Sequence, residues 1–141
     1  MPSHFLGCVF LGLLVVTTAA AAGSDGAAPP VIAPADLVHA RNGDKAGWRR
    51  FCAESRGKKV VWPATVVASL RQFGDDYMES GLLLLDVDGG DNGRPEIAVD
   101  IRPSQVKTFS PGQRLTLGGI LRGCDIQGAD PVVRIEPLTI E

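Results

Sequence analysis

The sequence predicts one mainly β domain, a five-stranded barrel preceded by a short α-helical segment. From residue 58 onward, runs rich in β-branched residues and leucine recur about every ten positions between turn residues, which is typical of short strands. Before residue 58, apolar residues recur instead at helical spacing. The chain has 141 residues, of which 45% are hydrophobic and 21% charged, so it is long enough to bury one core and not composed like a disordered chain.

Residues 1–22 predict a signal peptide, because an apolar run ends in consecutive alanines that fit an A-x-A cleavage site. The first residues carry no Lys or Arg, so an uncleaved membrane anchor is the alternative. Residues 23–33 are rich in Gly, Ala and Pro and predict a flexible tether. We therefore expect a periplasmic or secreted protein that meets a membrane only through this N-terminal segment, if the segment stays uncleaved.

Residues 34–57 predict an N-terminal helical segment. Pro34 suits the first turn of a short helix, for which Asn42-Gly43 is a natural stop. Asp44 can cap a second helix, and Gly57 can supply a left-handed residue at its end. One face of this second helix is expected to dock on the core, through Trp48, Phe51, Cys52 and Ser55.

Residues 58–141 predict the barrel, with strands at 58–70, 81–87, 96–102, 113–122 and 132–140 and one helical turn near 103–106. Pro63 and Gly118-Gly119 are costly inside flat strands, but they fit bulges where a small sheet curls and closes. Pro137 indicates that the last strand lies at an edge.

Three runs, at residues 58–61, 86–101 and 112–121, follow this strand pattern, the last with the form G-x-x-L-x-L-x-G-x-L. In these runs the chain resembles small exported bacterial OB-fold proteins, of the anticodon-binding-like and periplasmic bacterial OB-fold types. The resemblance implies an OB-fold-like barrel that binds ligands over its second and third strands. Such proteins usually bend the first strand at a glycine, where this chain has Trp62-Pro63-Ala64, so the register around Pro63 stays open.

The two cysteines beyond the signal peptide, Cys52 and Cys124, predict a disulfide, as an even pair does in an exported chain. In an OB-fold the first and fourth strands pair antiparallel, which brings both cysteines to the same end of the barrel. Two buried free thiols are the alternative. We expect no metal site and no cofactor, because His39 is the only histidine left after cleavage and no CxxC pair is present.

Charge is segregated along the chain. Residues 41–59 carry seven basic residues against two acidic ones, whereas residues 75–100 carry eight acidic residues against one arginine. The acidic region covers the expected ligand face, so we expect nucleic acid not to be a ligand there. The sequence therefore predicts a candidate binding face, at Phe73, Asp75, Asp76, Tyr77, Asp86, Asp88, Asp91 and Arg94, and a candidate basic patch at Arg49, Arg50, Lys58 and Lys59.

No catalytic constellation is visible in the sequence. There is no G-x-S-x-G nucleophile elbow, and the acidic run 86–93 lacks the Gly and Glu positions of an EF-hand loop. We therefore expect an exported, non-catalytic OB-fold binding module that recognises a protein partner or an envelope polymer. The alternative is a small-ligand or cation-binding periplasmic stress protein.

Overall fold

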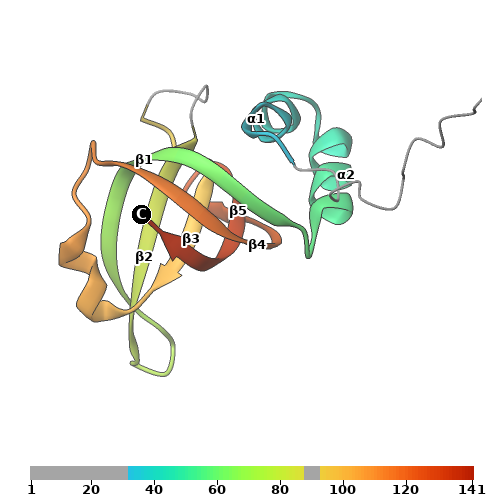
Figure 1. Ribbon diagram of the computed structural model, residues 1–141. Coiled ribbons are helices and arrows are strands. Elements are labelled where there is room, and N and C mark those ends of the chain that lie inside the picture. The colour runs from blue at the N-terminus through green and yellow to red at the C-terminus, as the bar shows by residue number, and fades with distance from the viewer. Residues whose placement is uncertain (1–31, 88–92) are drawn as a thin grey trace, which may run out of the picture.

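The computed structural model describes residues 32–87 and 93–141, in which five strands close into a barrel with two helices at one end (Figure 1). The strand order around the barrel is β1-β2-β3-β5-β4. The strands are β1 (Lys59–Phe73), β2 (Glu79–Val87), β3 (Ile97–Ile101), β4 (Arg114–Gln127) and β5 (Asp130–Ile140). The helices are α1 (Pro34–Asn42), α2 (Lys45–Ser55) and the 3-10 helix η2 (Pro103–Thr108) between β3 and β4.

This architecture confirms the predicted fold class, a mainly β, OB-fold-like barrel after a short helical segment. The predicted signal peptide at 1–22 lies outside the described residues, and so does the tether up to residue 31. Ile32 is buried in the core, and its carbonyl accepts a hydrogen bond of 2.8 Å from Trp62 Nε1. The packed part of the chain therefore includes Ile32, two residues before the expected boundary at residue 34, because the Ile32 side chain belongs to the core and its carbonyl holds the Trp62 indole.

β1 and β4 extend beyond their predicted C-terminal ends, and β2 and β5 each begin two residues before their predicted starts. β1 continues to Phe73 and pairs with β2 from Glu79 onward, so the β1–β2 hairpin projects from the barrel (Figure 1). β4 continues to Gln127 because a register shift between Leu121 and Gly123 absorbs residues whose composition predicts a turn. Both extensions create surface that a simple barrel would lack.

The register around Pro63 is defined by its partners. β1 pairs with β4 over residues 59–65 and with β2 over residues 64–73, and Pro63 lies opposite Thr116. Pro63 therefore has a neighbouring strand on one side only. A residue without an N–H group is tolerated at such a position.

The expectation that β5 is an edge strand is wrong for the strand as a whole, because β5 pairs with β4 over residues 130–140 and with β3 at residues 133–135. Pro137 nevertheless lies beyond the stretch that pairs with β3, so its missing N–H costs no ladder hydrogen bond on that side. The opposing residue is Gly119, where a Cβ atom would lie only 2.4 Å from the Glu136 carbonyl oxygen. Glycine is required there because β4 and β5 approach so closely.

Helix α2 forms as the sequence predicts. Asp44 Oδ1 accepts a hydrogen bond of 2.6 Å from Gly47 N, and Gly57 follows the helix in the left-handed region at φ 82°. Ser55 is buried, while the rings of Trp48 and Phe51 stack at 6.0 Å and pack against the core.

The disulfide between Cys52 and Cys124 is present, with Cα atoms 5.8 Å apart. It links α2 to β4 at the end of the barrel where residues 57 and 58 hydrogen-bond to Leu121. Cys124 lies within β4, opposite Val133, and not after the strand as its neighbouring glycine indicates.

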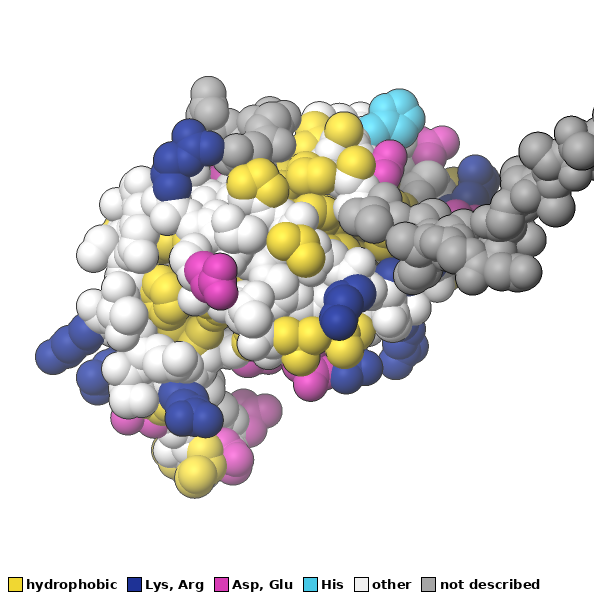
Figure 2. Space-filling view, in the orientation of Figure 1, with side chains coloured by type: hydrophobic (Ala, Val, Ile, Leu, Met, Phe, Trp, Pro, Cys, Tyr) yellow, Lys and Arg dark blue, Asp and Glu magenta, His cyan; other side chains and the backbone are white. Residues whose placement is uncertain are grey.

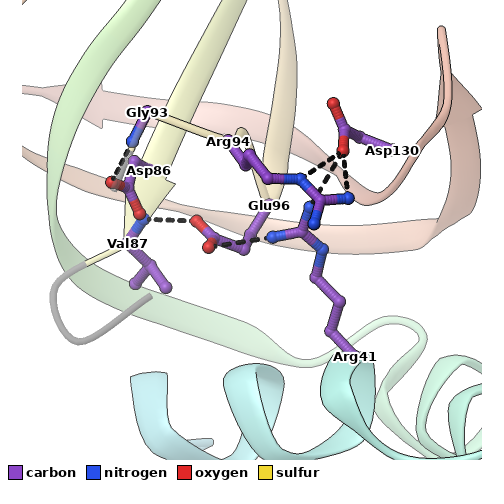
Figure 3. A network of polar contacts seen from close by, with 7 residues as sticks. All are labelled: Arg41, Asp86, Val87, Gly93, Arg94, Glu96 and Asp130. Atoms are coloured by element: carbon purple, nitrogen blue, oxygen red, sulfur yellow. Dashed lines mark hydrogen bonds and ion pairs between the residues drawn. The ribbon is translucent and has the colours of Figure 1, made fainter. Parts of the chain in front are cut away.

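Helix α1 is held by a buried ion pair (Figure 3). Arg41 Nη1 lies 3.0 Å from Glu96 Oε1, and the two side chains are only 5% and 1% exposed. The other carboxylate oxygen of Glu96 accepts from Val87 N at 2.9 Å. Asp130 accepts from both Arg41 and Arg94, so one network joins α1, β2 and the β4–β5 hairpin.

Candidate ligand-binding groove

A concave surface of about 500 Å³ lies where α2 meets the end of β4. Trp48 and Ala53 of α2 line one side, and the disulfide with Gly123 lines the other. Three arginines surround it: Arg49 from α2, Arg56 at the C-cap of α2, and Arg122 from β4. No Asp or Glu is among the residues that line this surface, which we call the arginine pocket.

The arginine pocket can bind an anion. A guanidinium presents several N–H donors in a planar fork that matches phosphate and carboxylate groups. The half-buried Trp48 indole adds an aromatic wall, which suits a base or another flat group. Cations and an aromatic surface in one shallow site are the combination that single-stranded nucleic acid binding uses.

Two further hollows continue from the arginine pocket across the outer surface of the barrel. A hollow of about 390 Å³ shares Arg122 with the pocket, and one of about 560 Å³ shares Asp100 and Pro137 with that middle hollow. The third hollow ends at η2, where Arg102, Gln105 and Phe109 line it. The three hollows adjoin one another through these shared lining residues over β4, β5 and β3, and we call them together the arginine groove.

Two ion pairs lie within the arginine groove. Arg134 Nη2 donates to both carboxylate oxygens of Asp100, at 2.7 and 2.8 Å. Arg122 donates to Glu136 across the β4–β5 pair. These four charges balance one another, whereas Arg49, Arg56 and Arg102 add positive charge at the two ends of the groove.

The structure separates the predicted binding face into two places. One group of its residues, Phe73, Asp75, Asp76 and Tyr77, occupies the projecting tip of the β1–β2 hairpin, while Asp86 and Arg94 lie at the opposite end of β2. Nine residues of β2 at about 3.3 Å each separate the groups by roughly 30 Å. Asp88 and Asp91 lie outside the described residues. Whether either group binds a ligand stays a prediction.

The hairpin tip exposes apolar side chains beside acidic ones, which Figure 2 shows gathered at the bottom of the molecule. Phe73, Tyr77 and Met78 are 72%, 90% and 67% exposed. Tyr77 also has φ 59°, in the left-handed region that disfavours a bulky side chain. A strained, exposed aromatic residue at a loop tip is a feature that functional sites often carry.

The other end of β2 holds Asp86 and Arg94 in the structural network of Figure 3. Asp86 Oδ2 accepts from Gly93 N at 3.3 Å, and no residue within 32–87 or 93–141 donates a hydrogen bond to its buried Oδ1. Arg94 donates to Asp130. Among the residues that the structure describes, no group of three or more His, Cys, Asp or Glu is placed to hold a metal ion.

The predicted basic patch is also divided. Arg49 lines the arginine pocket and the neighbouring Arg50 is exposed on α2, while Lys59 lines a smaller hollow of about 170 Å³ over β1, β4 and β5. Lys58 is exposed in the turn that leads into β1.

Sequence reasoning missed the arginines that complete the groove: Arg56, Arg102, Arg122 and Arg134. A signal was present, because Arg122 and Arg134 alternate with the buried Leu121, Val133 and Ile135 and so point outward. Strand alternation alone does not show which outward residues from different strands become neighbours.

No protein-family model matches this chain, and no curated protein matches it. A solved structure with a similar fold is that of a Klebsiella pneumoniae protein described as a "putative nucleic acid-binding lipoprotein". The two chains superpose with a TM-score of 0.55 at 11% sequence identity, over 78% of this chain and 92% of the Klebsiella chain. At this identity the likeness shows a shared fold.

The expectation that nucleic acid is not a ligand is contradicted by this neighbour and does not stand. It rested on the acidic count over residues 75–100, which lie mainly on the hairpin tip and β2–β3. The arginine groove shares Asp100 of β3 with that region, and its other lining residues come from outside residues 75–100. Within residues 32–87 and 93–141, no helix has the length and apolar character needed to cross a membrane.

Proposed function

We propose that this chain is an exported, non-catalytic binding module that holds a phosphodiester polymer in the arginine groove. The observation that carries the proposal is the arginine pocket, where Arg49, Arg56 and the Glu136-paired Arg122 lie beside a tryptophan wall, with no carboxylate among the described residues that line it. Single-stranded nucleic acid and phosphate-containing envelope polymers share the repeated phosphate that such a surface recognises. The fold it shares with the Klebsiella protein, whose description includes nucleic acid binding, supports the same direction.

Export is supported by the apolar N-terminal run together with the disulfide, since disulfides persist in oxidising compartments. A periplasmic or secreted location is therefore part of the proposal. The absence of catalysis is also proposed, because the groove presents arginines and an aromatic surface, and its two carboxylates, Asp100 and Glu136, are held in arginine pairs.

The proposal is tested by fluorescence anisotropy with a labelled oligo-dT strand at several salt concentrations. We expect the logarithm of the association constant to fall linearly with the logarithm of the salt concentration, because each phosphate contact releases a counterion. Arg49→Glu with Arg56→Glu should weaken binding at least tenfold and reduce the salt slope by about 0.7 for each lost phosphate contact.

The control is Arg71→Glu, which reverses an exposed arginine of the hairpin that lines none of the three hollows. A base-free polyphosphate of equal charge separates the two ligand sources: equal affinity indicates backbone recognition alone, and tighter binding of oligo-dT indicates stacking on Trp48. The proposed function is refuted if neither oligo-dT nor polyphosphate binds. It is also refuted if both bind the Arg49→Glu, Arg56→Glu variant as tightly as wild type.

A second candidate function, recognition of a protein partner, is favoured by the hairpin tip. Its exposed Phe73 and Tyr77 lie beside Asp75 and Asp76, so the tip fits a partner with an apolar cleft and a basic rim. Aromatic residues that project from a surface often dominate the energy of protein interfaces.

This candidate is tested by mild cross-linking of the tagged protein in its native envelope. Tyr77→Ala with Asp75→Lys should remove one specific cross-linked protein while leaving the affinity for oligo-dT unchanged. A cross-linking pattern identical to that of wild type would exclude the hairpin tip as a docking site.

A further inference from the structure

The two ion pairs inside the arginine groove differ from the ion pairs elsewhere in the molecule, because they lie along the path a ligand would take. The middle hollow is lined by all four partners: Asp100, Arg122, Arg134 and Glu136. Their side chains are accessible, with Arg122 and Glu136 55% and 50% exposed and Arg134 and Asp100 28% and 69% exposed. Any anion lying in the groove must meet these carboxylates.

We propose that Glu136 and Asp100 act as internal competitors of the ligand, so that a polyanion binds by taking their places on Arg122 and Arg134. This inference rests on the proposed function and adds to it a basis for specificity. An exposed carboxylate–arginine pair contributes little free energy, so exchanging its carboxylate for a phosphate costs little. The carboxylates turn toward solvent as the phosphates arrive.

The exchange selects polymers over single anions. A free phosphate that enters the middle hollow displaces one carboxylate. The free energy of its contact with the arginine about equals the free energy of the ion pair that is lost. A polymer that displaces both carboxylates also reaches Arg49 and Arg56 at one end and Arg102 at the other, none of which forms an ion pair with another described residue. Because its phosphates are linked, the later contacts form at high effective concentration. The groove therefore discriminates by the length of the charged chain.

The test is Glu136→Gln, which keeps the size of the side chain and removes its charge. We expect oligo-dT to bind about fivefold more tightly at low salt, the effect of one charge a few ångströms from the ligand in water. The salt slope should stay close to that of wild type, because a phosphate contacts Arg122 in both proteins. Asp100→Asn should act in the same direction through Arg134.

The matched control is Glu79→Gln, which makes the same change in net charge at an exposed arginine pair of the hairpin, Arg71–Glu79. Both variants are folded if their melting temperatures stay close to that of wild type. Tighter binding by Glu136→Gln but not by Glu79→Gln supports the competitor role. Equal effects of the two, or weaker binding by Glu136→Gln, overturn it.

The two proposals fail in different ways. If oligo-dT binds and depends on Arg49 and Arg56, but neutralising Glu136 and Asp100 gives no gain over the Glu79 control, then only the competitor role is overturned. If wild type binds neither oligo-dT nor polyphosphate, the proposed function and the competitor role fall together. Wild type that binds inorganic phosphate as tightly as oligo-dT would overturn the selection for polymers.

Discussion

The helical end of the barrel and the projecting β1–β2 hairpin each contain an arginine–glutamate pair, and the two pairs differ in burial. Arg41 and Glu96 are 5% and 1% exposed, whereas Arg71 and Glu79 are 50% and 35% exposed. Inside the protein an unpaired charge is very costly, so the buried pair fixes α1 in one place. At the surface water replaces a lost partner, so the exposed pair constrains the hairpin very little.

This difference in burial determines how each region can interact with a ligand. The helical end is held by the buried network and the disulfide, so the arginine pocket between α2 and β4 is preorganised. The hairpin tip has exposed aromatic side chains and weak ion pairs, so it can adjust to a partner. A rigid cationic site suits a repetitive polymer, and an adjustable apolar tip suits a protein surface.

The largest effect is expected from breaking the buried pair. Arg41→Met leaves the Glu96 carboxylate buried without its guanidinium, which should lower the free energy of unfolding by about 3–5 kcal/mol. Urea denaturation followed by circular dichroism measures the loss. Adding Glu96→Gln removes the buried negative charge and keeps a side-chain oxygen that can accept the hydrogen bond from Val87 N. The double variant should therefore recover part of the stability. A double variant less stable than Arg41→Met would contradict this account.

The next largest effect is expected from the disulfide. Cys52→Ala with Cys124→Ala removes the cross-link between residues separated by 72 positions in the sequence. The entropy of the unfolded chain then predicts a loss of at most about 4 kcal/mol in the free energy of unfolding. Because α2 carries two of the three pocket arginines, the affinity for oligo-dT should fall as well. Unchanged affinity in the folded variant would show that the pocket does not depend on the cross-link.

A smaller effect, of opposite sign, is expected at the hairpin tip. Tyr77→Gly relieves a side chain held at positive φ and should raise the free energy of unfolding by up to about 1 kcal/mol. Thermal denaturation measures the change, with Phe73→Ala as an exposed aromatic control at ordinary φ. A decrease in stability would mean that the Tyr77 ring contributes packing that outweighs the backbone strain.

The smallest effect is expected from Arg71→Ala, which removes the exposed counterpart of Arg41. The free energy of unfolding should change by less than about 1 kcal/mol, and raising the salt concentration should remove the difference. A loss as large as that of Arg41→Met would invalidate the contrast between the two regions.

The sequence was sufficient for the parts of the fold that depend on local pattern. Alternation located all five strands, Asp44 and Gly57 marked the ends of α2, and the two cysteines indicated their bond. The arginine groove could not be predicted, because it joins outward positions of three strands whose neighbours are set by barrel closure. Glu96 was counted as one acid among several, although closure buries it against Arg41 from a segment 55 residues away.

The pairing of β5 with both β3 and β4 has a consequence for how the molecule folds. The parallel β3–β5 contact and the β1–β4 contact both join segments far apart in the sequence, and neither can form until β5 and β4 are available. Folding of such a topology is slow, because the entropy of closing long loops is lost before the contacts repay it. During that delay the strands that wait for β4 and β5 keep unpaired edges, a state that aggregates readily if it persists.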